Sequence, residues 1–165
     1  MKSKLLALLF IGIFALTVTG CGKEKTLEKI EVKGPRVVCT TTSEEDGIKV
    51  DATATLKFNS DNYVNYQLME TTMTFKDKKV FDAYAKSMEE DTMEFGDDIE
   101  YNYAINKKKK QISSYMIYKE SLFDYSKVSD EDKADYKASV IIEKYDDDKA
   151  TCEFIETTRQ DLGIE

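Results

Sequence analysis

The sequence predicts an α+β domain, with a mostly antiparallel sheet and two helices packed on one of its faces. Residues Ile48–Phe58 alternate strictly between apolar and polar side chains, which is the period of a strand with one buried and one exposed face. Residues 76–92 and 129–145 instead place apolar side chains at helical spacing. The resulting order, β-β-β-α-β-β-α-β, is typical of the α+β class because the strands follow one another in runs.

The first three strands are expected to form an antiparallel meander. Arg36–Thr42 is rich in valine and threonine, which favour strands, and Ser43–Gly47 has the composition of a turn. The alternating strand Ile48–Phe58 follows this turn. Asn59–Asn62 then predicts a hairpin loop, after which Tyr63–Phe75 returns as the third strand.

Two helices interrupt the strands. The first is expected from residue 76 to about residue 92, with Asp77 as its N-cap. Its apolar positions are Val80, Phe81, Tyr84, Ala85 and Met88.

The second helix begins at Ser129, which has an acid three residues later, as in a capping box. Its apolar positions are Ala134, Ala138, Ile141 and Tyr145. One alternative stays open here, because Val140–Tyr145 could also begin a strand.

Three further strands complete the domain. Ile99–Ile105 and Ile112–Lys119 flank a basic turn, Asn106–Lys110. The last strand, Lys149–Glu156, follows a run of three aspartates that predicts a turn. The polar tail after residue 157 is expected to be frayed.

Residues 1–20 have the organisation of a secretion signal. They contain Lys2 and Lys4 but no acidic residue. The apolar run Leu5–Val18 is shorter than the roughly 20 residues that a membrane-spanning helix needs. Its length is that of the apolar part of a signal peptide, so we expect the chain to be exported.

A lipidation motif follows the apolar run. The stretch Val18-Thr19-Gly20-Cys21 resembles the lipobox of bacterial lipoproteins. This resemblance implies that a peptidase cuts between Gly20 and Cys21 and that a diacylglyceryl group joins the Cys21 thiol. The expected location is therefore the extracytoplasmic face of the cell membrane, with the protein anchored by its lipid. Two alternatives are an ordinary signal peptide followed by an incidental cysteine, and an uncleaved signal anchor.

Three regions follow from this interpretation. Residues 1–20 are the lipoprotein signal peptide, residues 21–35 are the lipidated cysteine and a tether, and residues 36–165 are a single globular domain. The tether is flanked by glycine and rich in lysine and glutamate, which is typical of a linker.

The charge and composition exclude several classes of function. The formal net charge is −8, and it becomes −10 when the two lysines of the signal peptide are removed. This acidic balance argues against nucleic acid as a partner and against electrostatic docking on anionic lipid. The chain contains no histidine, which is the commonest general base and metal ligand. We therefore predict neither an enzyme nor a metal site nor a cofactor.

Cys39 and Cys152 remain once Cys21 is lipidated. An even pair of cysteines in an exported domain predicts a disulfide, which requires the first and last strands to lie side by side. Two buried free thiols are the alternative. A catalytic thiol is disfavoured because the chain has no histidine to activate it.

This plan of strands, with a cysteine in the first and in the last strand, resembles the YehR-like lipoproteins, a group of small lipoproteins of Gram-positive bacteria. The resemblance covers most of the globular domain and includes no sharp motif. That group carries no activity to transfer, so the resemblance implies a location and a fold only.

Several surface groups are candidates for a site. Tyr101 and Tyr103 share one face of their strand, whereas Tyr115 and Tyr118 fall on opposite faces of the next one; a sheet lined with tyrosine can stack on sugars or pack against a protein. The basic turn Lys107–Lys110 could bind phosphate, a polyanionic wall polymer or lipid headgroups, although solubility is the simpler explanation. The aspartate runs at 97–98 and 146–148 lack the spacing of a calcium loop and are expected to be solvated turns.

The leading hypothesis is a membrane-anchored extracytoplasmic lipoprotein with a binding or structural role in the cell envelope. Its partner would be an envelope protein or a wall component. The alternatives are a carboxylate-based cell-wall hydrolase and an accessory subunit that presents a ligand to a transporter. Two converging carboxylates in a deep polar cleft would favour the hydrolase, and a closed apolar cavity would favour the ligand carrier.

Overall fold

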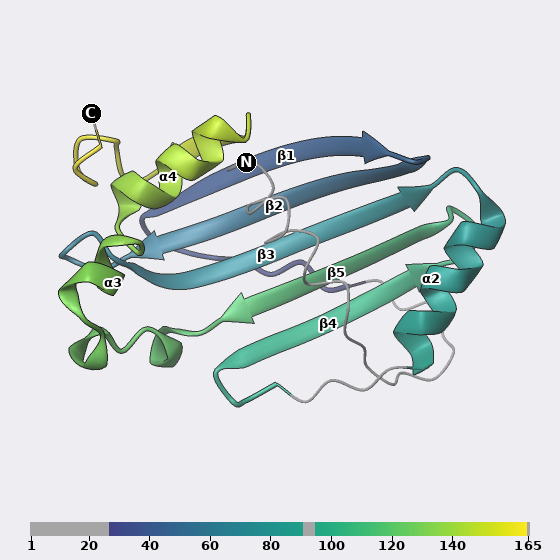
Figure 1. Cartoon of the computed structure of the whole chain (residues 1–165), viewed down its shortest axis with the longest axis horizontal. Helices are drawn as coiled ribbons and strands as arrows, with labels where there is room; N and C mark the ends of the chain where they lie inside the picture. The colour runs from purple at the N-terminus through teal and green to yellow at the C-terminus, as the bar shows by residue number, and fades with distance from the viewer. Residues whose placement is uncertain (1–26, 91–94, 165) are drawn as a thin grey trace.

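Six strands and two longer helices form the domain in the computed structural model, which describes residues 27–90 and 95–164 (Figure 1). The strands are β1 (Arg36–Glu45), β2 (Ile48–Phe58), β3 (Val64–Phe75), β4 (Ile99–Asn106), β5 (Gln111–Tyr118) and β6 (Thr151–Ile155). The helices are α2 (Lys78–Glu90), α3 (Asp130–Ala134) and α4 (Ala138–Asp147), and α3 is preceded by the single 3₁₀ turns η2 (Glu120–Leu122) and η3 (Tyr125–Lys127). The strands lie in the order β4-β5-β3-β2-β1-β6, and every neighbouring pair is antiparallel. The α+β class is confirmed, and the order of the elements matches the prediction except that two helices, α3 and α4, lie between β5 and β6.

Both longer helices pack on the same face of the sheet, which we call the helix face; the opposite face is the open face. Val50 and Leu56 have the same parity on β2, so they point to the same side. Val50 packs at one end against α2, and Leu56 packs at the other end against α4. The α2 cluster is Met73, Phe75, Phe81, Ala85, Met88 and Ile112. The α4 cluster is Val37, Cys39, Ala54, Leu56, Val64, Met69, Met116, Ala138, Ile142, Tyr145 and Leu162.

The turn between β1 and β2 is shorter than predicted. Ser43, Glu44 and Glu45 pair with β2, so the strand continues through most of the segment that has turn composition. Only Asp46 and Gly47 lie outside the ladder, with φ of 51° and 77°. Two residues with positive φ form the tight hairpin turn that matches the twist of the strands, which explains the Asp-Gly pair.

Helix α2 begins as the sequence predicts. The Asp77 carboxylate accepts hydrogen bonds from the backbone N–H groups of Lys79 (2.7 Å) and Val80 (3.0 Å), so it caps the first turn. The buried stripe is narrower than predicted, because Val80 and Tyr84 are 38% and 39% exposed. The predicted end of the helix at residue 92 lies outside the described residues.

The second predicted helix is two helices. Ser129 caps α3 by accepting a hydrogen bond from the backbone of Asp132 at 3.2 Å. The chain then breaks because it pairs with the start of β3: Val64 N–H donates to the Tyr136 carbonyl (3.0 Å), and Tyr63 and Lys137 form a β-bridge. The segment Val140–Tyr145 is helical and belongs to α4.

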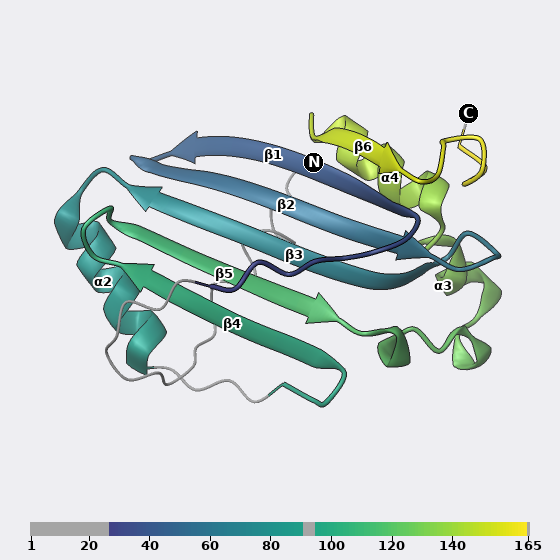
Figure 2. The same ribbon diagram turned by 180° about the vertical axis from the view of Figure 1, so that it is seen from behind.

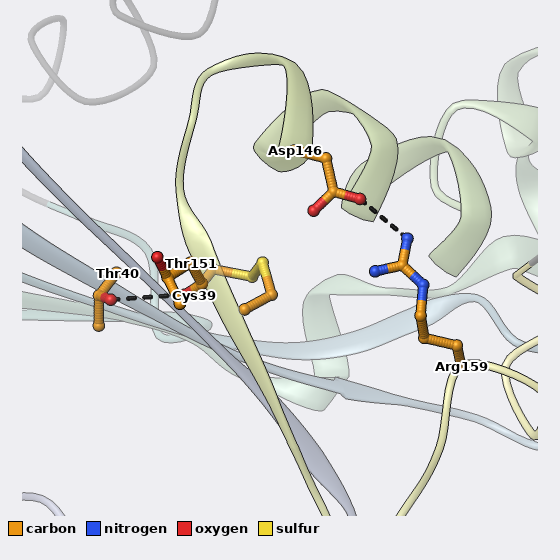
Figure 3. The surroundings of a disulfide bond; sticks show 6 residues. Cys39, Thr40, Asp146, Thr151 and Arg159 are labelled. Carbon is orange, nitrogen blue, oxygen red and sulfur yellow. Dashed lines mark hydrogen bonds and ion pairs between the residues drawn. A yellow bond between two sulfur atoms is a disulfide. The ribbon is translucent and has the colours of Figure 1, made fainter.

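The tail after residue 157 is folded, which corrects the prediction that it is frayed. Leu162 is 8% exposed and belongs to the α4 cluster. Thr158 and Asp161 bond to each other's backbone and side chains, and Arg159 pairs with Asp146 on α4 at 2.8 Å. The buried Leu162 and this ion pair hold the tail against α4. Figure 3 shows the ion pair.

A disulfide joins the first and last strands. Cys39 and Cys152 face each other across the β1–β6 ladder, and their sulfurs are bonded over a sequence separation of 113 residues. Thr40 Oγ1 donates to the Thr151 carbonyl beside the bridge (Figure 3). The predicted disulfide and the predicted contact of the two strands are therefore confirmed.

Reduction of this disulfide is expected to lower the melting temperature by several degrees without abolishing the fold. The bridge closes a loop of more than 100 residues, worth at most about 4–5 kcal/mol in the chain-entropy model. β6 is a short edge strand that pairs only with β1, whereas β2, β3 and β5 do not depend on it. Thermal melts with and without reductant measure the difference. The Cys39→Ala/Cys152→Ala variant should have the lower melting temperature, and reductant should not change it. Two titratable thiols in denatured, non-reduced protein would contradict the bridge.

The described part of the tether crosses the open face. Residues 27–35 run over the sheet on the side away from α2 and α4 and reach the start of β1 (Figure 2). The predicted signal peptide, Gly20 and Cys21 lie outside the described residues. Of the predicted tether, the part from Leu27 onward is a covering segment of the sheet rather than a free linker.

Candidate binding site on the open face

The four candidate tyrosines do not form one surface. Tyr101, Tyr103 and Tyr118 lie on the helix face, and Tyr115 lies on the open face, as the strand register requires. The Tyr101 ring packs against Phe95 (5.6 Å between centroids), and burial raises the pKa of Tyr101 to about 12. These helix-face tyrosines extend the core, so a shared stacking surface is not present in the described structure.

The open face instead carries a polar hollow of about 520 Å³ at the centre of the sheet. Leu27, Glu28 and Lys29 of the tether form part of its rim. Its side chains come in pairs from four strands: Thr40 and Thr42, Asp51 and Thr53, Glu70 and Thr72, Ser113 and Tyr115. We call these eight residues and the space between them the polar hollow.

The eight side chains form two rows across the strands. The first row is Thr42, Asp51, Thr72 and Ser113, and the second row is Thr40, Thr53, Glu70 and Tyr115. Directly opposite residues of antiparallel strands lie on the same face with their Cβ atoms about 5 Å apart. Each row is therefore a continuous line of hydroxyl and carboxylate groups.

Hydrogen bonds within the first row fix its carboxylate. Thr42 Oγ1 donates to Asp51 Oδ1 at 2.7 Å, and Lys49 Nζ donates to Asp51 Oδ2 at 2.9 Å. The bond from Lys49 and then that from Thr42 lower the pKa of Asp51, so it is ionised at neutral pH. Thr72 and Ser113 share a hydrogen bond of 3.0 Å between their hydroxyls.

The side chains of the second row use less of their hydrogen-bonding capacity. Partial burial raises the pKa of Glu70, and the nearby Lys29 ammonium opposes that shift. Within residues 27–90 and 95–164, no side chain donates a hydrogen bond to the Glu70 carboxylate. Tyr115 Oη donates to Glu100 Oε1 at 2.9 Å, which holds the tyrosine ring at the edge of the hollow. Glu70 is thus a carboxylate with free acceptor capacity that faces a concave surface.

An apolar groove lies on the helix face, between α4 and β3. It has a volume of about 340 Å³, and its apolar lining residues are Leu56, Val64, Met69, Phe123, Tyr136, Ile141 and Tyr145. Asp135 and Lys144 stand at its rim, 3.9 Å apart. This groove is an extension of the α4 cluster, with charge only at its mouth.

The remaining candidates lie apart from each other. Lys107, Lys108 and Lys109 are exposed in the β4–β5 turn, and Lys110 Nζ donates to the Lys76 carbonyl. The aspartates at 146–147 end α4 instead of forming the predicted turn. In the described part of the chain, no three histidine, cysteine, aspartate or glutamate side chains come together as a metal site would require.

No known protein family, curated protein or solved structure matches the chain. The described helices include none that has the length and apolar character to span a bilayer. The function is therefore inferred from the chemistry of the sequence and of the polar hollow.

Proposed function

We propose that this chain is a lipid-anchored domain on the extracytoplasmic face of the cell membrane, and that it binds a neutral carbohydrate of the cell envelope in the polar hollow. The observation that carries the proposal is the pair of hydroxyl and carboxylate rows around a 520 Å³ concavity on the face that the helices leave uncovered. The lipobox-like stretch ending at Cys21 supports the anchoring.

The side chains of the hollow match the groups of a sugar. Threonine, serine and tyrosine hydroxyls both donate and accept, and an ionised carboxylate accepts from two neighbouring hydroxyls at once. The Tyr115 ring at the edge offers an apolar face for stacking. A volume of 520 Å³ lies within the range of small-ligand sites.

The charge of the site selects against anions. Asp51 and Glu70 line the hollow, and Glu28 stands at its rim. Lys29 is also at the rim, while Lys49 is already paired with Asp51. A phosphate or a sulfate would meet several carboxylates and few free cations, so a neutral ligand fits best.

A carboxylate-based hydrolase is the second candidate, and one observation favours it. Asp51 and Glu70 line the same hollow from diagonal positions on adjacent strands, and their surroundings shift the two pKa values in opposite directions. Such a pair could divide the roles of base and acid. Against this, Asp51 is held by Lys49 and Thr42, and the site is a shallow surface of the sheet.

Binding of neutral sugars tests the proposal. The Glu70→Gln substitution should lower the affinity for such a sugar by roughly 10-fold to 100-fold. This loss corresponds to a charged hydrogen bond of about 1.5–3 kcal/mol. The mature lipidated protein, in a detergent without a sugar headgroup, is titrated calorimetrically with neutral disaccharides. Thr53→Val should also weaken binding, because it removes one hydroxyl at nearly constant shape.

Glu153→Gln is the matched control, since Glu153 is an exposed carboxylate on β6 outside the hollow. An equal loss in this variant, or no binding of any neutral disaccharide, would overturn the proposal. Release of shorter products, abolished in Glu70→Gln, would instead establish the hydrolase.

A further inference from the structure

We infer that the polar hollow takes its ligand from the membrane itself, as the neutral glycosyl headgroup of a lipid in the bilayer that holds Cys21. This inference deepens the proposed function and rests on it, including the lipid anchor. It names the source of the carbohydrate, which the chemistry of the hollow alone leaves open.

The covalent chain sets how far the hollow can lie from the bilayer. Leu27 is part of the rim of the hollow, and only residues 22–26 separate it from Cys21. A chain extends at most about 3.5 Å per residue, so the rim lies within roughly 20 Å of the anchored cysteine in any conformation. A wall polymer beyond that distance is out of reach, whereas the headgroups of neighbouring lipids are within it.

The described part of the tether lies on the open face of the domain. Leu27 and Lys29 adjoin the hollow, and Glu31, Val32 and Lys33 lie beside Lys57 and Tyr66. Figure 2 shows the described tether crossing this face of the sheet. The tether therefore joins the domain on the open face, at Leu27, while α2 and α4 cover the other side of the sheet. The hollow is on the same side as this junction.

The charge around the hollow distinguishes among membrane headgroups. The carboxylates of Glu28, Asp51 and Glu70 surround the hollow, against one lysine, Lys29, at its rim. An anionic phospholipid headgroup is repelled by such a surface. A glycosyl headgroup is neutral and presents the vicinal hydroxyls that the two rows can bind.

The anchor raises the affinity without any further contact. A short tether holds a binding site at an effective concentration in the millimolar range near ligands in the same membrane. A shallow sheet surface, which gives weak affinity for a free sugar, is then sufficient for occupancy. Lengthening the tether lowers this effective concentration roughly as the −3/2 power of its length.

Competition between a lipid-borne and a soluble sugar tests the inference. The lipidated protein is reconstituted in phosphatidylcholine vesicles that contain diglucosyl or digalactosyl diacylglycerol, and is titrated with the methyl glycoside of the same disaccharide. The apparent affinity for the soluble glycoside should fall at least about 10-fold relative to plain phosphatidylcholine, because the headgroup occupies the hollow. Vesicles with phosphatidylglycerol should give no such fall.

A long Gly/Ser insertion after Gly22 is the matched variant. It should relieve the competition several-fold in glycolipid vesicles and leave the affinity for the soluble glycoside in plain vesicles unchanged. Soluble glycoside that binds equally in all vesicles would overturn this inference and leave the proposed function standing. An equal fall with phosphatidylglycerol would overturn the choice of a neutral headgroup. Absence of glycoside binding in every vesicle would overturn both the inference and the proposed function.

Discussion

Leu56→Ala is expected to lower the free energy of unfolding by about 2–5 kcal/mol. Leu56 is 1% exposed and lies in the α4 cluster, between Val37 on β1 and Gln67 on β3. Truncation removes the transfer free energy of its side chain and leaves a cavity that the flanking strands cannot close, since both are held in the ladder. Urea melts of the two proteins measure the difference.

Lys57→Ala, one residue along the same strand, is the control and should cost less than about 0.5 kcal/mol. Lys57 points to the open face, so its loss leaves no cavity in the core. Equal destabilisation by the two substitutions would mean that the faces of β2 are assigned the wrong way round.

The local part of this fold could be predicted because it depends on local patterns. The alternation in Ile48–Phe58 gives the helix face of β2, where Ala52, Ala54 and Leu56 are buried; Thr55 on the opposite face is also buried, which the alternation did not predict. Asp77 and Ser129 cap helices because a short polar side chain can satisfy the first free N–H groups wherever it stands. The cysteine pair predicted one long-range contact, that of β1 with β6, because a disulfide allows few relative positions of the two strands.

The errors come from pairing between distant segments. The break between α3 and α4 is caused by residues 62–64 at the start of β3, which are distant in sequence and bond to residues 136–138. Leu162 looked like part of a polar tail because two apolar residues, Leu162 and Ile164, are too few to show a periodicity. Neither effect has a signal in the local sequence.

The candidate site shows the same division more sharply. In the sequence, the polar residues of each strand are typical of a solvent-exposed face, such as Thr40 and Thr42 on one strand and Glu70 and Thr72 on another. Only the order β5-β3-β2-β1 places these pairs in two rows. The tyrosines were the more visible signal in the sequence, but three of the four pack toward the core because burying aromatic area is favourable.

Cys21→Ala is expected to abolish lipidation completely. In the proposed pathway the diacylglyceryl group is attached through the Cys21 thiol, and alanine has no atom to accept it. Loss of the two acyl chains removes about 0.8 kcal/mol for each buried methylene, so the cut protein should leave the membrane fraction. Uncut precursor is the other expected product, and it would stay in the membrane through the apolar run Leu5–Val18.

Fractionation alone cannot separate these two products from a lipidated protein, so the decisive measurement is metabolic labelling with a fatty-acid analogue. The natural protein should carry the label, and Cys21→Ala should carry none whether it is released or retained as precursor. Cys39→Ala is the matched control: it also removes a cysteine, but one that is 1% exposed and bonded to Cys152, so the label should persist. Label on the Cys21→Ala protein would refute the anchor, and with it the distance limit that places the polar hollow beside the bilayer.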